Sequence, residues 1–175
     1  SELDTEVAQK IFDEQNNILD KIILNAFNKT KNQLKTLKNT ILPRIALYKA
    51  LNNYGFSMED SNNHMKNYML NYIAKSKHNS MVKMEKVPGF YSLYSKIFLK
   101  IMRKTDLQQS KQKHDAKSFD VTITKCLWHQ ACVENECPEL CRLFCDVDNI
   151  TYGELNKIGF TSCLLYTSDA ADDRI

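Results

Sequence analysis

Two thiols and two carboxylates in the C-terminal part of the chain have the chemistry needed to attack and open a carbon–heteroatom bond. They are Cys126, Glu139, Cys145 and Asp148, in the segment 119–148, FDVTITKCLWHQACVENECPELCRLFCDVD. A thiol can attack covalently or protonate a departing group, and a carboxylate can pair with a cation or activate water. We take these four residues as the candidate catalytic residues.

Cys126 follows residues 119–123, whose apolar side chains alternate with polar ones and predict a half-buried strand. It therefore lies where a strand gives way to a helix, and helix N-terminal amides stabilise a thiolate. His129 is close enough to meet the thiol if the helix starts at once, which would make an activated pair. The alternative is a small buried thiol packed under the junction.

Glu139 comes directly after Pro138, a residue suited to the first turn of a helix. A negative charge there interacts favourably with the helix dipole, so its non-catalytic role is to stabilise that turn. Asp148 follows Cys145 by three positions and shares its face if the helix reaches that far. Asp146 and its polar neighbours indicate instead that the helix is ending, which would make Asp148 a cap or a surface charge.

Cys137, Cys141 and Cys145 occur at i, i+4 and i+8, so a helix that starts at Pro138 would align them on one face. Three thiolates with a carboxylate or imidazole could bind zinc. Structural zinc sites more often use closer Cys-x-x-Cys pairs, and small buried apolar residues explain the same spacing. We expect neither a metal nor a cofactor.

The strand ending in Cys126, the Pro-Glu-Leu element at 138–140 and the Phe-Cys-x-x-Asp run that ends at Asp148 resemble the core motif of the L-2-amino-thiazoline-4-carboxylic acid hydrolase family. Residues 42–51, LPRIALYKAL, and residues 86–98, KVPGFYSLYSKIF, resemble the helical half of that family. Together these segments cover much of the chain.

The resemblance implies hydrolysis of the thiazoline ring of L-2-amino-thiazoline-4-carboxylate to N-carbamoyl-L-cysteine. Under it, Glu139 or Asp148 takes the carboxylate role, Cys126 takes the thiol role, and Cys145 supports the pocket. Because one fold can host unrelated sites, two alternatives stay open: a small-molecule-binding or sensory domain without turnover, and a metal-binding regulatory domain.

The first half of the chain predicts helices. Residues 5–37 have apolar positions at helical spacing with no Pro or Gly, which predicts one long helix. Pro43 near the start and Gly55 after the end predict a second helix over residues 42–54.

Ser57, with Asp60 three residues later, predicts the start of a third helix. We expect it to end near Ala74, before a polar stretch. Apolar residues at i, i+3, i+4, i+7, i+8 and i+11 from Phe90 predict a fourth helix.

The predicted fold class is α+β, in one domain over residues 1–162. A helical part (1–104) is followed by a linker (105–118), which is rich in Gln, Lys and Ser, and by a cysteine-bearing strand-helix-strand part (119–162). The strand at 119–126 needs a partner for its backbone groups. We expect that partner from a segment missing after residue 162.

The last residues carry a different signal. Residues 163–173, CLLYTSDAADD, resemble the translation of a sequencing adapter, so we exclude residues 163–175 from functional reasoning. The expectation is a domain truncated at its C-terminus, and the absence of an initiator Met at Ser1 suggests an incomplete N-terminus as well.

Composition favours a soluble globular protein, and the resemblance implies a small-molecule substrate. The chain is 43% hydrophobic with eight Phe and eight Tyr, and it has no apolar run of membrane-spanning length and no signal sequence. All six cysteines lie at or after residue 126, unlike a disulfide framework, so we expect reduced thiols in a cytoplasmic protein.

The first 118 residues are basic, but their lysines alternate with apolar residues, and we expect no nucleic-acid partner. The sequence does not indicate an oligomeric state.

Overall fold

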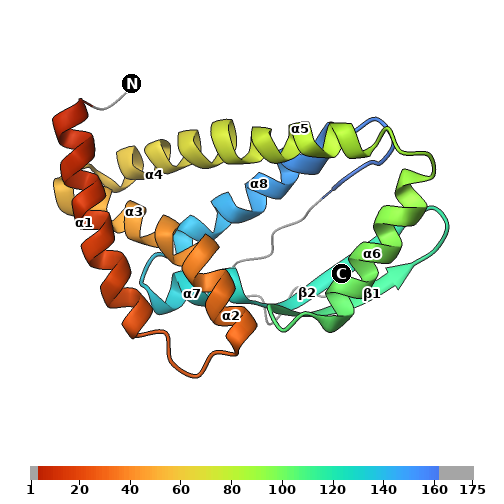
Figure 1. Cartoon of the computed structure of the whole chain (residues 1–175), viewed down its shortest axis with the longest axis horizontal. Helices are drawn as coiled ribbons and strands as arrows, with labels where there is room; N and C mark the ends of the chain where they lie inside the picture. The colour runs from red at the N-terminus through yellow and green to blue at the C-terminus, as the bar shows by residue number, and fades with distance from the viewer. Residues whose placement is uncertain (1–3, 162–175) are drawn as a thin grey trace.

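The computed structural model describes residues 4–161, and these residues form the predicted α+β fold (Figure 1). Helices occupy the first two thirds of the chain, and a two-stranded antiparallel sheet lies against one of them. The helices of this part are α1 (Thr5–Leu24), α2 (Lys31–Thr36), η1 (Leu37–Ile41), α3 (Leu42–Tyr54), α4 (Met58–Lys66), η2 (Asn67–Ala74), α5 (Lys75–Met84) and α6 (Phe90–Lys104). The adapter-like residues 163–175 lie outside the described residues.

The single long helix predicted for residues 5–37 is wrong. α1 ends at Leu24, the chain turns through Asn28 with φ 55°, and α2 begins at Lys31. Thr30 caps α2: its hydroxyl accepts from the Gln33 amide at 3.1 Å, and the Gln33 side chain accepts from the Thr30 amide at 3.1 Å. This reciprocal capping box starts a new helix without help from Pro or Gly. α1 can then fold back along α3.

The predicted helix over residues 42–54 is confirmed as α3. Pro43 lies in its first turn, and Gly55 ends it with φ 109°, a conformation in which a side chain would be strained. α3 continues directly from the π-helical η1; six of its 13 residues are buried, and only Asn53 and Tyr54 are exposed. It therefore forms the central helix of the helical half.

The third helix starts as predicted but runs further. Ser57 caps it by accepting from the Asp60 amide at 3.0 Å. α4, η2 and α5 follow one another without a break to Met84, so the expected end near Ala74 is wrong. The polar residues after Ala74 lie on a mostly exposed surface, and Met81 beyond them is buried, which keeps the helix against the core.

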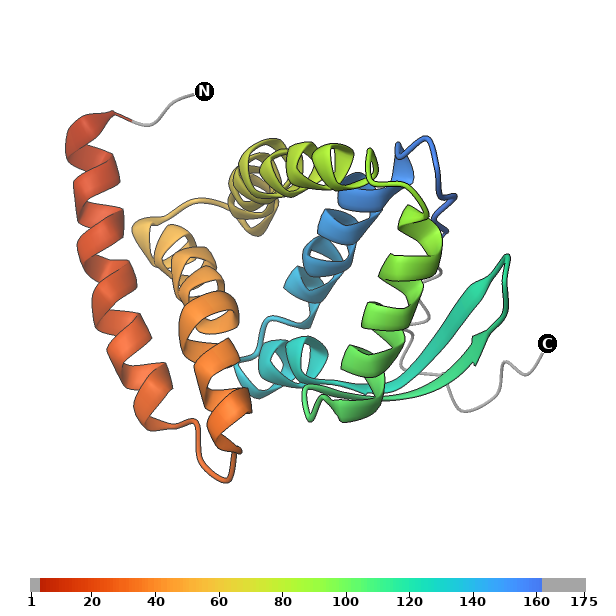
Figure 2. The ribbon, with the colours of Figure 1, turned by 45° about the vertical axis from the view of Figure 1, so that its right-hand side comes forward.

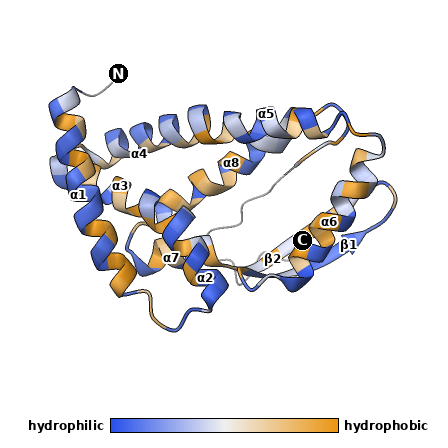
Figure 3. Cartoon of the chain, in the orientation of Figure 1, coloured by the Kyte–Doolittle hydropathy of each residue, from blue (hydrophilic) through white to orange (hydrophobic). Residues whose placement is uncertain are grey.

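The predicted linker at 105–118 contains a strand, β1 (Gln108–His114), which pairs antiparallel with β2 (Phe119–Cys126). β2 is confirmed, but its partner precedes it in the chain, whereas we expected one from beyond residue 162. The sequence pattern did not indicate β1, because its residues are polar, and they are polar because much of this hairpin is exposed. The polar character of β1 is plain in Figure 3.

An irregularity in this sheet decides where Cys126 points. Gln109 pairs with Lys125 but Ser110 pairs with Ile123, so Thr124 is an extra residue in β2. A bulge of this kind reverses the alternation of side chains between the two faces. Cys126 is therefore on the face that also carries Phe119, and Phe119 packs edge-on against Phe98 of α6 with ring centroids 5.4 Å apart.

After the sheet come α7 (Leu127–Glu134), η3 (Pro138–Leu140) and α8 (Cys141–Gly153). The expectation that this last helix ends near Asp146 is wrong, because α8 continues for seven residues beyond it. α8 packs against η2 and α5, and Figure 2 shows it alongside α6 as well. Within residues 4–161, no helix has the length and apolar content needed to cross a membrane.

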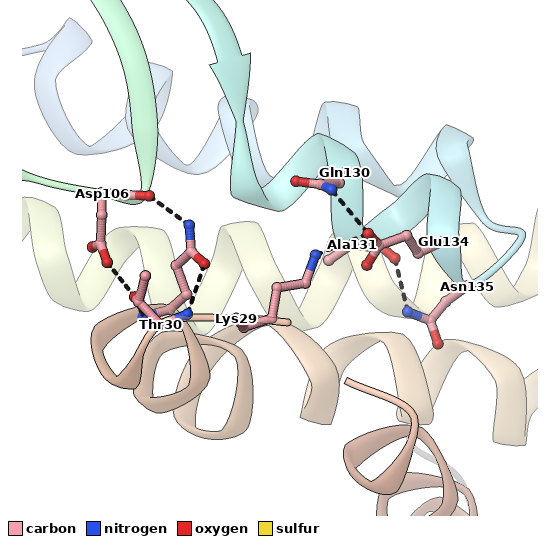
Figure 4. A network of polar contacts seen from close by, with 8 residues as sticks. Lys29, Thr30, Asp106, Gln130, Ala131, Glu134 and Asn135 are labelled. Carbon is pink, nitrogen blue, oxygen red and sulfur yellow. Dashed lines mark hydrogen bonds and ion pairs between the residues drawn. The ribbon is translucent and has the colours of Figure 1, made fainter. Parts of the chain in front are cut away.

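Two polar anchors hold the cysteine-bearing part to the helical part. At the first, Asp106 accepts a hydrogen bond from Thr30 (Figure 4). Asp106 also accepts from Asn32 at 2.5 Å, and Gln33 donates to its carbonyl oxygen at 2.7 Å. Beside it, Lys29 pairs with Glu134 of α7 at 2.8 Å. The turn before α2 thus fixes the start of the hairpin and the end of α7.

At the second anchor, buried Glu85 receives the chain that leaves α8. Its carboxylate accepts from the backbone amides of Asn156 at 2.9 Å and Lys157 at 3.2 Å, and from the Asn156 side chain at 3.3 Å. These bonds lower the Glu85 pKa and outweigh the opposing effect of burial. The segment that follows α8 is therefore tied to the end of α5.

We expect Asp106→Asn to lower the free energy of unfolding in a pH-dependent way. The hydrogen bonds from Thr30 and Asn32 lower the pKa of Asp106 below its ordinary value of 3.8. A lowered folded-state pKa contributes stability above the unfolded-state pKa and loses it as the pH falls through the folded-state value. Denaturant titrations of both proteins should give a gap that is largest at neutral pH and closes in acid.

The control is Asp20→Asn, an exposed aspartate on α1, which should leave stability unchanged. A gap between wild type and Asp106→Asn that stayed constant down to the lowest pH would contradict a role for the Asp106 charge.

Candidate active site

Cys126 is both the last residue of β2 and the N-cap of α7, as the sequence predicts. Its thiol makes no capping hydrogen bond to the first turn of α7, and the Leu127 amide donates instead to the Leu107 carbonyl at 2.9 Å. The helix amides therefore do not hold the sulfur directly. Cys126 is half-buried, so a small molecule can reach it. His129 lies in the first turn of α7 and is half-buried.

Cys145 and Asp148 lie on one face of α8, because α8 continues past both of them. Cys145 interacts electrostatically with both Cys126 and Asp148. Cys145 is therefore within electrostatic reach of two of the other predicted catalytic residues. The bulge in β2 places Cys126 on the face that carries Phe119, and the helical period of α8 places Cys145 and Asp148 on one face.

The protonation of Cys145 and Asp148 is set by their surroundings. A hydrogen bond to Cys141, followed by burial, raises the pKa of the Cys145 thiol, which is therefore protonated at neutral pH. Desolvation also raises the pKa of Asp148, although solvent still reaches its carboxyl group, and the nearby charge of Lys77 partly opposes that rise. A partly desolvated carboxylate beside a protonated thiol is a pairing suited to proton transfer.

Glu139 lies at the other end of the cysteine-bearing face. Its exposed carboxylate accepts a hydrogen bond of 2.7 Å from the hydroxyl of Tyr48, which is 2% exposed. Burial, together with the Glu139 charge, raises the pKa of Tyr48 to about 12. Asp148 follows Glu139 by nine positions, which corresponds to roughly 14 Å along a helix. The two carboxylates therefore cannot both contact one small ring.

Between these ends lies a cluster of three buried thiols, Cys132, Cys137 and Cys141. Hydrogen bonds to Cys137 and Cys141, with burial, raise the pKa of Cys132, and the bond from Cys132 lowers the pKa of Cys137. None of the five described cysteines is in a disulfide. Within residues 4–161, no three His, Cys, Asp or Glu side chains are grouped so as to hold a metal ion, so the alignment of Cys137, Cys141 and Cys145 does not produce a zinc site there.

Sequence reasoning missed three groups near Asp148. Lys77 of α5 interacts with its charge, and so do the phenol groups of Tyr94 on α6 and Tyr152 on α8. Tyr152 had a detectable signal, since it follows Asp148 by four positions on a helix. No sequence signal indicated Lys77 or Tyr94, because only the fold brings α5 and α6 close to Asp148.

Two hollows elsewhere on the molecule do not touch this cluster. One of about 60 Å³ lies behind α7, beside Leu37 and Ala131. The other, of about 420 Å³, is an open groove over α1 and α3 beside Phe12 and Arg44. Neither is lined by a thiol, and the groove has no carboxylate. The solvent-reachable cluster of Cys126, Cys145 and Asp148 is therefore the better candidate for chemistry.

An α+β fold whose site combines thiols with a solvent-reachable carboxylate of raised pKa is consistent with a hydrolytic enzyme class. The model of the L-2-amino-thiazoline-4-carboxylic acid hydrolase family matches residues 35–164, and the chain belongs to that family. The match includes α3, α6 and all four predicted catalytic residues. A search of the curated proteins and a search of the solved structures give no match.

We expect Tyr48→Phe to lower the free energy of unfolding by about 1 kcal/mol, the usual contribution of one hydrogen bond. Glu139→Gln should have a similar or smaller effect, since an amide still accepts from Tyr48. Both variants should keep wild-type turnover if Glu139 only anchors η3 to α3. Chemical denaturation and product assays measure the two quantities separately.

Tyr54→Phe is the matched control on the same helix, because its side chain is 43% exposed; it should change neither quantity. A large loss of turnover in Glu139→Gln, with stability intact, would show instead that Glu139 takes part in the reaction.

Proposed function

We propose that the protein hydrolyses the ring of L-2-amino-thiazoline-4-carboxylate and releases N-carbamoyl-L-cysteine, with Cys126, Cys145 and Asp148 as its catalytic residues. The observation that supports this proposal is the electrostatic interaction of Cys145 with Cys126, at the β2–α7 junction, and with Asp148, on the same face of α8. Family membership supports the same chemistry.

The charges around the cluster suit the substrate. The substrate has a cationic amidine at one end and a carboxylate at the other. Asp148 can pair with the amidinium, and Lys77, close enough to affect the Asp148 pKa, can pair with the carboxylate. Such a pair would orient the ring with its electrophilic carbon towards Cys126.

The first half of the proposed reaction opens the ring. The Cys126 thiolate forms a bond to the amidine carbon, and the electron pair of the carbon–nitrogen double bond moves to nitrogen. The bond from this carbon to the ring sulfur then breaks. The departing sulfur takes a proton from the Cys145 thiol, which is protonated at neutral pH.

The second half releases the product. Water adds to the same carbon while one of its protons passes to Asp148. The bond to the Cys126 sulfur breaks as the urea carbonyl forms, so Cys126 is again a thiolate. The proton on Asp148 passes to the Cys145 thiolate and restores the thiol used in ring opening, and the second proton of the water goes to solvent, because a cationic amidine has become a neutral urea. The sum is addition of one water molecule with release of one proton, and the product carries a free thiol and a urea carbonyl.

Product formation tests the proposal directly, because ring opening frees a thiol that a chromogenic disulfide reagent detects after the protein is removed. Cys126→Ser should abolish turnover. Asp148→Asn should lower kcat by about 100-fold or more, the range of general acid–base catalysis. Asp146→Asn, a matched change two residues away on α8 but off the face that carries Asp148, should keep wild-type turnover.

Asp148→Asn should also raise, or leave unchanged, the melting temperature at pH 7. A carboxyl group whose folded-state pKa is raised contributes stability below its unfolded-state pKa and loses it as the pH rises through the folded-state value. The neutral amide removes that cost. A variant that lost both activity and stability would indicate a structural role for Asp148, and full turnover in Cys126→Ser would remove Cys126 from the reaction.

A further inference from the structure

One face of α8 carries a fourth functional group beyond the predicted cysteines and aspartate. Cys141, Cys145, Asp148 and Tyr152 occur at i, i+4, i+7 and i+11, so they follow one another along the same side of the helix. A helical side chain leans towards the N-terminus of its helix. The ring of Tyr152 therefore reaches back over the turn that carries Asp148, and its phenol group interacts with the Asp148 charge.

Tyr152 is held in place by aromatic neighbours. Its ring centroid lies 6.1 Å from that of Tyr94 and 5.3 Å from that of Phe160. Tyr94 is itself stacked between Phe90 at 5.4 Å and Phe98 at 5.8 Å on α6. Both tyrosines are half-buried, so their hydroxyls lie at the edge of the site and not in bulk solvent.

Burial raises the pKa of both tyrosines, and the two phenols hydrogen-bond to one another. When Tyr94 is the donor, the proton of Tyr152 is available to donate elsewhere. The bond from Tyr94 then makes Tyr152 a stronger donor, because hydrogen bonds in a chain polarise one another.

We propose that Tyr152 is a further catalytic residue, which donates a hydrogen bond to the water that attacks beside Asp148, and that Tyr94 positions it. This inference rests on the proposed function and assigns Tyr152 to the second half of that reaction. Asp148 accepts a proton from the water, and Tyr152 donates to its oxygen as that oxygen becomes the urea carbonyl. The bond formed is between carbon and oxygen, and the bond broken is between carbon and the Cys126 sulfur.

The assignment has a kinetic consequence that a structural role does not share. Without the Tyr152 hydroxyl, ring opening proceeds, but hydrolysis of the Cys126 adduct slows. Removal of one donor of this kind typically costs about 100-fold or more in rate. We therefore expect Tyr152→Phe to lower kcat by about 100-fold and to lower KM in parallel, so that kcat/KM stays near its wild-type value.

The experiment measures steady-state kinetics and intact-protein mass spectra of acid-quenched samples with L-2-amino-thiazoline-4-carboxylate. Tyr152→Phe should accumulate a protein species heavier by one substrate molecule, and Tyr94→Phe should show the same effect more weakly. Tyr91→Phe is the matched control on α6, because its hydroxyl donates to the Asp115 carbonyl at 3.4 Å. It should match the wild type.

The outcomes separate the inference from the proposed function. Wild-type kcat in Tyr152→Phe, or an equal fall in kcat and kcat/KM with no heavier species, overturns the role of Tyr152 while the proposed function stands. A wild-type protein that forms the adduct but releases no product contradicts the proposed function; the Tyr152 role then also falls, because there is no hydrolytic step for it to assist. A wild-type protein that gives neither adduct nor product overturns both.

Discussion

The period of α8 is the constraint on which the rest of the site depends. Side chains three or four residues apart share one face of a helix, so α8 presents Cys141, Cys145, Asp148 and Tyr152 in succession. The buried side chains of Leu143, Val147 and Thr151 lie beside that face, and α8 packs against η2 and α5. A helix that ended near Asp146 would leave Asp148 and Tyr152 without defined positions.

Charge and burial distinguish two ends of the cysteine-bearing part, one at Glu139 and one at Asp148. At the Glu139 end, an exposed carboxylate is bonded to a buried tyrosine, and three buried thiols bond to one another. That arrangement joins η3 to α3 and leaves Glu139 with one oxygen already occupied. At the Asp148 end, the groups are half-buried or exposed, and desolvation raises the pKa of Asp148. Groups that react with a ligand must be reachable, so the structure favours the second end for catalysis.

The sequence predicts those features that follow from local pattern. Pro43 and Gly55 delimit α3, Ser57 starts α4, and alternation defines β2, because each of these signals acts within a few residues. The spacing of Cys145 and Asp148 likewise places them on one face. The clustering with Cys126 is also consistent with the family motif.

The features that the sequence missed depend on distant contacts. β1 is polar because much of the hairpin is exposed, so nothing in its composition indicates a strand. The break before α2 rests on Thr30, whose bond to Asp106 joins residues 76 positions apart. Lys77 and Tyr94 reach Asp148 only because α5 and α6 pack near α8. The bulge at Thr124, which turns Cys126 inward, arises from strand pairing and has no local signature.

The most direct measurement is the location of the covalent bond between protein and substrate. Substrate labelled with carbon-13 at the amidine carbon would be mixed with the wild-type chain, quenched within milliseconds and digested with trypsin. Because no Lys or Arg lies between Lys125 and Arg142, the peptide 126–142 holds Cys126 together with Cys132, Cys137 and Cys141, and fragment ions must distinguish them. The account predicts the label on Cys126. Label on any other cysteine, or turnover with no labelled peptide at any quench time, would contradict it.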